Sequence, residues 1–343
     1  MSEAAESAPS LEQVVPDAEE LSAATASDGC LSEQMTADAG GAVCATYGGG
    51  ASNVTEMPEI DLPQTGAAST VAAMPATETT VNQDELILAQ EQKIADDIKA
   101  SIQMVGPKTD LGPLQREFAN DIVYSTKVDQ LQTRYSYMRR TRPDGNCFLR
   151  GFIFAYLEHC ISHMEELLRF KKYIADSKEE LFKLGFPKFT TEDFYDMFMD
   201  VLSDLEKNSS LERVESIMND PGTSDYLVVY LRLLISAHLQ KNADFFTFFI
   251  EGGRTVEEFC KQEVEPMYRE CDHLHIVSLT AALSVAVCVL YMDRGDSKTA
   301  AAHHFPEDAT QPVIYLLYRP GHYDVLYKAE EAPAATATEQ QET

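Results

Sequence analysis

Basic residues are missing from the first 80 positions of the chain. Residues 1–80 contain thirteen Asp and Glu and no Lys or Arg, and they pass through stretches rich in Ala, Ser, Thr and Gly such as Ala42–Ser52. A segment of this composition cannot bury enough apolar surface to offset the entropy lost on ordering. We therefore predict a disordered acidic tail over residues 1–80, and a second disordered tail over residues 329–343.

Positive charge is scarce in the rest of the chain as well. The whole sequence has 27 Lys and Arg against 56 Asp and Glu, which gives a formal net charge of −29. Proteins that bind nucleic acid present clusters of Lys and Arg. The composition therefore argues against a nucleic-acid partner and favours a neutral or basic protein partner.

Secretion and disulfide signals are also absent from the sequence. The N-terminus has no basic segment followed by an apolar one, and the seven cysteines are an odd number without a close framework spacing. We expect a reducing compartment, the cytosol or also the nucleus. The uncharged run Ile276–Met292 is slightly short for a membrane span, so we interpret it as a helix followed by a buried strand and expect no membrane partner.

The segment between the two tails predicts many helices followed by late strands. That order indicates an α/β (α+β) fold, with a small central sheet flanked by helices. The expected helices cover 82–103, a segment starting at about 147, 163–184, 191–206 and 211–218, and three more are capped by Ser224, Thr255 and Asp272. The expected strands are Val285–Tyr291, Val313–Tyr318 and Tyr323–Tyr327, the last two joined by a Pro-Gly turn.

The first predicted helix, Asn82–Gln103, is amphipathic. Ile87, Ile94, Ile98 and Ile102 form an apolar stripe at helical spacing, while charged residues fill the other faces. Two interpretations are open: the helix packs on the domain, or it forms an arm whose stripe meets a partner protein.

Cys147 is the cysteine that the sequence places at a helix start. Asp144-Gly145-Asn146 before it favours an irregular backbone, and the free N–H groups of a helix N-terminus favour a thiolate and a developing oxyanion. Asp-Gly-Asn before an apolar helix is also a common turn and cap, so this motif alone does not establish catalysis.

His322 supplies the second half of a possible catalytic set. It follows a Pro-Gly turn at the start of a strand, and Asp324 lies two residues further on. In an extended chain the two side chains project from the same face, so the carboxylate can orient the imidazole. A histidine satisfied in a surface hairpin is the alternative. A cysteine early on a helix with a later His-x-Asp on a strand is the arrangement of papain-like proteases.

The motif Pro143-Asp144-Gly145-Asn146-Cys147-Phe148-Leu149-Arg150 closely resembles the nucleophile motif of the ovarian-tumour (OTU) family of deubiquitinating cysteine proteases. The resemblance to the otubain members of that family covers roughly residues 81–328. It is carried by further segments: 135–137, 224–234, 249–256, 262–267, 291–295 and 315–327.

The resemblance implies a papain-like OTU catalytic domain over residues 109–328 and a helical arm that contacts ubiquitin or another partner over residues 81–108. It also implies hydrolysis of isopeptide bonds after the C-terminal glycine of ubiquitin, with lysine-48-linked chains as substrate. Cys147 would be the nucleophile, His322 the general base and Asp324 its orienting partner, with the backbone N–H groups of Asp144 and Cys147 lining the oxyanion hole.

A second function is also implied by the resemblance, namely binding of ubiquitin-conjugating enzymes and inhibition of ubiquitin transfer without proteolysis. We expect a monomer that uses no cofactor and no metal.

Two residues depart from the family pattern. Leu149 stands where tyrosine is expected, and Gly151 lies inside the predicted catalytic helix at a cost of ~1 kcal/mol relative to Ala.

Two histidine-containing segments lie outside this set. Cys271, His273 and His275, with Cys260 nearby, do not have a usual structural-zinc spacing, and the chain has no CxxC pair. His303-His304 precedes Phe-Pro and is interpreted as part of a solvated loop. Neither segment gives a competing function.

Overall fold

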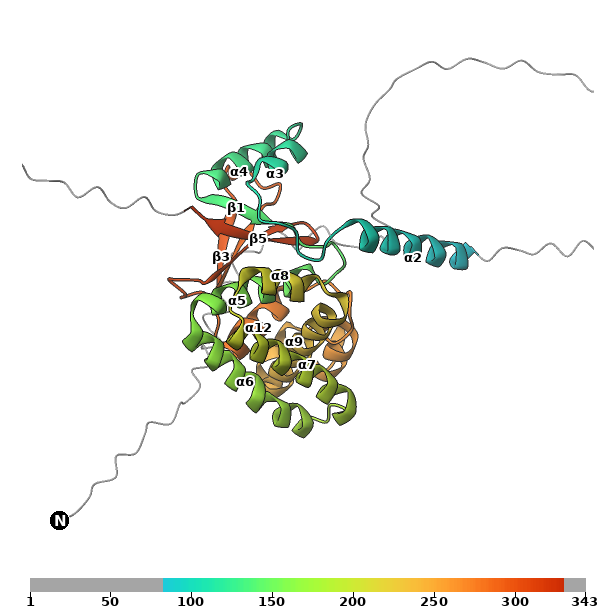
Figure 1. Cartoon of the computed structure of the whole chain (residues 1–343). Helices are drawn as coiled ribbons and strands as arrows, with labels where there is room; N and C mark the ends of the chain where they lie inside the picture. Colours follow the sequence, from blue (N-terminus) through green and yellow to red (C-terminus); the bar gives the residue numbers. More distant parts are fainter. Residues whose placement is uncertain (1–82, 330–343) are drawn as a thin grey trace, which may run out of the picture. The chain divides into compact units, whose positions relative to one another are not determined.

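The computed structural model describes residues 83–329. The tail predicted over residues 1–80 lies outside this range, as does the tail predicted over residues 329–343 apart from Ala329. Within the described range, the chain forms a mixed sheet and a set of helices (Figure 1). The predicted α/β architecture, a small central sheet flanked by helices, is confirmed.

The sheet has five strands in the order β1-β5-β4-β2-β3. Strands β2 and β4 are parallel, and the other neighbouring pairs are antiparallel. The hairpin predicted at the end of the chain is β4 and β5, which occupy the centre of the sheet. The strands are β1 (Tyr135–Arg139), β2 (Val287–Tyr291), β3 (Ala301–Phe305), β4 (Ile314–Arg319) and β5 (His322–Lys328).

Helices cover both faces of the sheet (Figure 1). The helices of the described range are α2 (Gln83–Ser101), which contributes no residue to the core, α3 (Gly112–Glu117), α4 (Ile122–Gln132), α5 (Cys147–Ser162), α6 (Met164–Lys183), α7 (Lys188–Lys207), α8 (Leu211–Asn219), α9 (Pro221–Lys241), α10 (Ala243–Phe246), α11 (Val256–Phe259) and α12 (His273–Leu283). Short helical turns η1 (Thr247–Phe249), η2 (Glu251–Gly253) and η3 (Cys260–Val264) connect α10 to α11 and extend α11.

Side chains that alternate along the strands divide the core into two layers. Leu316 of β4 and Val325 of β5 belong to the large cluster shared with α5, α6, α7, α9 and α12. Their neighbours Leu317 and Leu326 point the other way, into a smaller cluster with α3 and α4. This alternation follows from the two-residue repeat of a strand, and it buries the central strands on both faces.

Helix α9 begins earlier than the sequence indicated. Its N-cap is Asp220, whose side chain accepts a hydrogen bond from Thr223 N, and Pro221 stands at the first helical position. The prediction that Ser224 caps this helix is wrong. Ser224 lies inside the first turn and is buried. Proline at the first position costs no hydrogen bond, so Asp220-Pro221 is the stronger start signal.

Residues 109–143 contain more regular structure than the sequence indicated, namely α3, α4 and β1. His303 and His304 also lie in a strand rather than a loop, because β3 pairs with β2 at the edge of the sheet. An edge strand with a mixed polar face lacks the apolar alternation that identifies a central strand.

The uncharged run Ile276–Met292 divides as predicted. Its first part lies in α12, whose N-cap Asp272 forms a capping box with His275, and its second part is the buried strand β2. Within residues 83–329, no helix is long and apolar enough to cross a bilayer.

Helix α2 confirms the predicted helix. In its apolar stripe, Ile87 and Ile94 are exposed, and Ile98 is half-buried. Ile87 is 54% exposed and Ile94 is 41% exposed. The C-terminal end of α2 is held by Arg142, whose guanidinium donates to the carbonyl oxygens of Lys99 and Ile102. The interpretation of α2 as a helix packed along the domain is therefore not supported by the described contacts.

Candidate active site

Cys147 is the first residue of α5, and its side chain is only 4% exposed. The turn before it depends on Gly145, which has φ +74°. A Cβ on this residue would lie 2.2 Å from the carbonyl oxygen of Tyr268. Only glycine fits this position, both for backbone conformation and for space. The predicted placement of Cys147 at a helix N-terminus behind a tight turn is confirmed.

His322 and Asp324 form a direct pair at the start of β5. Atom Nε2 of His322 lies 2.9 Å from Oδ1 of Asp324. A carboxylate only accepts hydrogen bonds, so Nε2 carries a proton, and Nδ1 is the ring nitrogen available as a base. The Nδ1 atom is buried and has no N or O partner among the described residues.

Asp324 is fully buried and accepts hydrogen bonds on both carboxylate oxygens. Oδ1 accepts from His322 and from the backbone N–H of Thr141 at 3.0 Å, and Oδ2 accepts from Nη2 of Arg319 at 2.7 Å. Burial raises the pKa of Asp324, but the hydrogen bond from His322 and the charge of Arg319 outweigh burial and lower it. Asp324 is therefore ionised at neutral pH.

The imidazole of His322 is stabilised in its protonated form. Burial lowers the pKa of His322, but hydrogen bonding and charge from Asp324 and from the Cys147 thiol outweigh burial and raise the pKa to about 9. The thiol, the imidazole and the carboxylate thus interact in the order that nucleophilic thiol catalysis requires.

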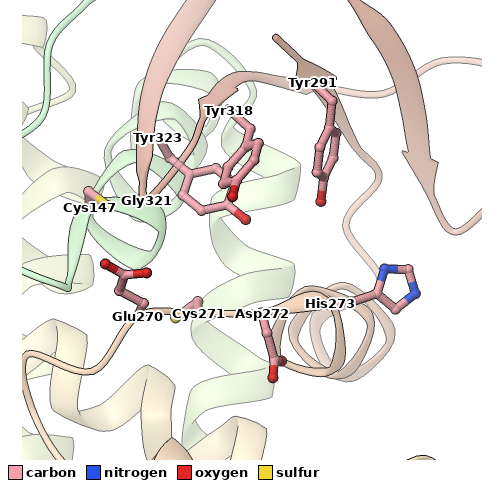
Figure 2. Close-up of a pocket in the computed structure, with 9 residues that line it drawn as sticks. All are labelled: Cys147, Glu270, Cys271, Asp272, His273, Tyr291, Tyr318, Gly321 and Tyr323. Carbon is pink, nitrogen blue, oxygen red and sulfur yellow. The ribbon is translucent and has the colours of Figure 1, made fainter. Parts of the chain in front are cut away.

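A cleft of about 290 Å³ opens beside Cys147. Figure 2 shows Cys147 at one end of this cleft and His273 toward the other. Tyr291 and Tyr318 contribute an aromatic wall, and their rings pack with centroids 4.7 Å apart. The other lining residues are Glu270, Cys271, Asp272, Gly321 and Tyr323. Glu270 gives this cleft an acidic side, whereas the Asp272 carboxylate points away and caps α12 (Figure 2).

Comparison with known proteins agrees with this geometry. The family model for peptidase C65, otubain, matches residues 97–328. The chain is 52% identical over 246 residues to ubiquitin thioesterase OTUB1 of Homo sapiens, covering 71% of this chain and 90% of that relative. It belongs to the otubain family. The sequence-based resemblance, and the expectation of a cysteine-type deubiquitinase, are confirmed at the level of this family.

A second relative and a solved structure extend the comparison across the otubains. Ubiquitin thioesterase OTUB2 of Homo sapiens is 38% identical over 234 residues, covering 68% of this chain and 99% of the relative. A solved complex of h/ceOTUB1 with ubiquitin aldehyde and UBCH5B~Ub has a TM-score of 0.69 and 35% identity, and the match covers 72% of this chain and 98% of that one. The otubain fold is therefore present in the described domain.

Asp144 has a different environment from the one expected of an oxyanion-hole residue. Its backbone N–H donates to the carbonyl oxygen of Arg142 at 3.0 Å, and its carboxylate accepts from Arg150 at 2.9 Å. The Asp144 N–H would have to leave Arg142 before it could bind an oxyanion. The N–H of Cys147 stands at the first helical position, where no intrahelical acceptor exists.

The departures from the family pattern are accommodated in this otubain without disturbing the helix. Leu149 is fully buried in the main core. A Cβ on Gly151 would lie 3.4 Å from side-chain atoms of Thr141 and Val325, so α5 packs closely against the sheet here. The glycine therefore marks a close helix–sheet contact.

Several residues of the site carry no sequence signal of their own. Arg319 binds Asp324, and Arg232 reaches the turn before Cys147 from α9. Glu270 lies in an irregular loop before α12. These residues come together only through the tertiary fold. Arg319 is a partial exception. It ends β4 directly before the predicted hairpin turn, so its sequence position indicates that it lies across from the start of β5.

In the segment Cys271–His275, His275 takes part in a helix cap and Cys271 lines the cleft. His275 Nδ1 lies 2.7 Å from Oδ1 of Asp272 in the capping box of α12. No cluster of three or more metal-ligating side chains occurs among residues 83–329.

Proposed function

We propose that this otubain hydrolyses the bond after the C-terminal glycine of ubiquitin, with Cys147 as nucleophile, His322 as general base and Asp324 as the residue that orients His322. The observation that carries the proposal is the 2.9 Å contact between His322 Nε2 and Asp324 Oδ1, with the imidazole interacting with a thiol that lines a cleft. The names of the relatives, ubiquitin thioesterases, support the substrate class.

The chemistry follows from the tautomer of His322. Nδ1 accepts the proton of the Cys147 thiol, and the thiolate attacks the carbonyl carbon of the terminal glycine. The imidazolium then gives that proton to the departing lysine amine, which leaves a thioester on Cys147. Water, deprotonated by His322, hydrolyses the thioester and restores the thiol. Asp324 stays ionised throughout and stabilises the imidazolium.

The acidic side of the cleft supports a peptide tail of basic character as ligand. Glu270 places a carboxylate on the wall of the cleft that Cys147 also lines. Glycine has no side chain, so a tail that ends in glycine can enter a cleft that excludes larger side chains.

We further propose lysine-48-linked ubiquitin chains as the substrate. The check is cleavage of lysine-48- and lysine-63-linked diubiquitin side by side, with at least about a tenfold difference expected; equal rates would remove the linkage proposal.

The direct test of catalysis uses ubiquitin carrying a thiol-reactive group at its C-terminus. Wild-type protein should form a single adduct, seen by intact mass, that is lost in Cys147→Ala. Cys271→Ala is the matched control, because Cys271 lines the same cleft and should leave the adduct in place. Loss of the adduct in Cys271→Ala but not in Cys147→Ala would identify Cys271 as the nucleophile and overturn the proposal.

A second function is favoured by the exposed apolar side chains of α2. Leu86, Ile87, Leu88 and Ile94 of α2, and Ile102 directly after it, are each more than one third exposed. Neighbouring solved structures contain h/ceOTUB1 bound to UBC13~Ub or UBCH5B~Ub. We propose that α2 of this chain contacts a ubiquitin-loaded conjugating enzyme and thereby inhibits ubiquitin transfer.

Paired variants separate this function from catalysis. Ile87→Glu with Ile94→Glu should relieve inhibition of ubiquitin-chain synthesis by UBC13, whereas Cys147→Ser should retain it. Gln92→Glu with Lys93→Gln adds the same negative charge on the polar face and serves as the control. If inhibition disappears in Cys147→Ser, or survives unchanged in the Ile87/Ile94 variant, the binding role of α2 is wrong.

A further inference from the structure

Arg232 is a buried arginine that the catalytic scheme does not use. It lies in α9, and its side chain is 0% exposed. The guanidinium group stays protonated in proteins, so a full positive charge lies inside the domain. A buried charge is costly unless hydrogen bonds satisfy it, and its partners therefore indicate what it stabilises.

Those partners come from the two loops that border the cleft. Nη1 of Arg232 donates to the carbonyl oxygen of Val264 at 3.0 Å. Nη2 donates to the carbonyl oxygen of Arg269 at 2.6 Å, to Oδ1 of Asn146 at 2.8 Å and to the carbonyl oxygen of Gly145 at 3.3 Å. One guanidinium thus joins residues 145–146, directly before the nucleophile, to the loop that leads to Glu270 and Cys271.

The acceptors are all uncharged. Among residues 83–329, the acceptors of the Arg232 side chain are three backbone carbonyl oxygens and the amide oxygen of Asn146. Burial lowers the pKa of Arg232, and the opposing electrostatic attraction of Cys271, Asp144 and Cys147 does not fully offset that effect. The guanidinium is therefore a cation held by backbone and amide oxygens, with its field acting on the thiol groups of the cleft.

The two loops also contact each other directly in a conformation that needs support. Tyr268 has φ +66°, a left-handed conformation that costs a residue with a Cβ about 1–2 kcal/mol. Its backbone N–H donates to Oδ1 of Asn146 at 3.2 Å, on the same oxygen that accepts from Arg232. Strain of this kind persists where surrounding contacts over-determine the backbone.

We infer that Arg232 is a positioning residue for the hydrolysis, holding Asn146, and through it Cys147, at a fixed place relative to the loop 264–271 that forms the other wall of the cleft. The inference rests on the proposed function, since it assigns the nucleophile to Cys147. Arg232 does not touch the substrate. Its contribution is to keep the attacking sulfur at a fixed position relative to the cleft wall. A displacement of about 1 Å from that position costs on the order of 10²-fold in rate.

The principal test compares two buried arginines. Arg232→Met removes the bridge, while Arg139→Met removes an equally buried arginine whose partners Gly106, Glu215 and Tyr327 do not line the cleft. We expect kcat for diubiquitin cleavage to fall at least about 30-fold in Arg232→Met, with KM changed less than about threefold. Arg139→Met should keep kcat within about threefold of wild type. Similar kcat losses in both variants, or retained kcat in Arg232→Met, would overturn the inference.

Hydrogen exchange gives a readout that a general loss of stability would not produce. In Arg232→Met, exchange should increase in residues 144–148 and 264–271 and remain unchanged in β4 and β5. An increase spread evenly over the domain would assign Arg232 a purely structural role.

A conservative variant keeps the test decisive if Arg232→Met does not fold. Arg232→Lys retains the charge but cannot reach both loops with a planar fork, so an intermediate kcat is expected. Combined with Asn146→Ala, its effect on kcat should be less than the product of the two single effects, because both changes remove the same contact. Multiplicative effects would contradict the inference.

The same experiments separate this inference from the proposed function. If wild-type protein forms no adduct with the ubiquitin probe at Cys147, the proposed function fails, whatever Arg232 does. If wild type reacts and Arg232→Met reacts equally fast, only the role of Arg232 fails.

Discussion

Arg319 and Asp324 are joined by a hydrogen-bonded ion pair of 2.7 Å between Nη2 and Oδ2, on the carboxylate oxygen opposite the one that binds His322. Arg319 ends β4 opposite His322, and Asp324 lies two residues further along β5 opposite Leu317, so the hairpin makes Arg319 and Asp324 diagonal neighbours on one face of the sheet. The Asp324 carboxylate therefore has a cationic partner on each oxygen side, His322 on Oδ1 and Arg319 on Oδ2, and both lower its pKa.

Removing that cation should destabilise the domain. In Arg319→Ala, the free energy of unfolding in urea should fall by about 2–4 kcal/mol, because a buried carboxylate loses its charged partner. Arg294→Ala is the control, since Arg294 pairs with Asp121 at the surface, where solvent screens the interaction. Equal destabilisation by both variants would show that the Arg319–Asp324 pair contributes no more to the free energy of unfolding than the surface pair does.

The pKa of His322 predicts the alkaline limit of activity. Because Asp324 and Cys147 raise this pKa from 6.5 to about 9, kcat/KM for a ubiquitin C-terminal amide should fall as pH rises through about 9, where the imidazolium is lost. In Asp324→Asn the strongest raising interaction is removed, so the decline should move to lower pH. An unchanged alkaline limb in Asp324→Asn would contradict the assignment of His322.

The same titration affects stability in a defined pH window. The folded-state pKa of His322 lies above the unfolded value, so its stabilising contribution is complete below pH 6.5 and is lost as pH rises toward about 9. Urea unfolding of wild type at pH 6 and pH 9.5 should differ by more than unfolding of His322→Gln does. Identical pH dependence in the two proteins would exclude His322 as the titrating group.

Gly145 should be far less tolerant of alanine than a glycine with similar backbone geometry. Gly145→Ala adds a Cβ 2.2 Å from a backbone oxygen, whereas Gly185, with φ +88°, has open space around its Cβ position. Gly185→Ala should cost about 1 kcal/mol of unfolding free energy for conformation alone. Gly145→Ala should cost more than this and also lower kcat, because the turn before Cys147 must shift. Equal unfolding costs would show that the turn adapts without strain.

Arg142 links the end of α2 to the turn before Cys147. Its guanidinium caps the carbonyl oxygens of Lys99 and Ile102, and its own carbonyl oxygen accepts from Asp144 N–H. In Arg142→Ala the last turn of α2 loses its caps, so amide exchange in residues 94–102 should increase several-fold, because a short helix without tertiary support is marginal. Arg140→Ala, which removes an exposed pair with Glu117, should leave exchange in α2 unchanged.

The sequence by itself determined the chemistry and much of the local structure. Turn and cap residues before Cys147, the spacing of His322 and Asp324, and the capping residues Thr255 and Asp272 act over a few positions, so they can be read from short stretches. Apolar periodicity likewise located α2 and the buried strands.

Tertiary structure decided which distant residues serve the site. Arg232 and Arg319 reach Asn146 and Asp324 from other elements, and the 264–271 loop supplies Glu270 to the cleft only because α9 and α12 bring it beside α5. A buried arginine resembles an exposed one in a single sequence, because its partners are carbonyl oxygens that every residue possesses. The edge strand β3 and the exposure of α2 were decided in the same way, by which faces the packed core leaves uncovered.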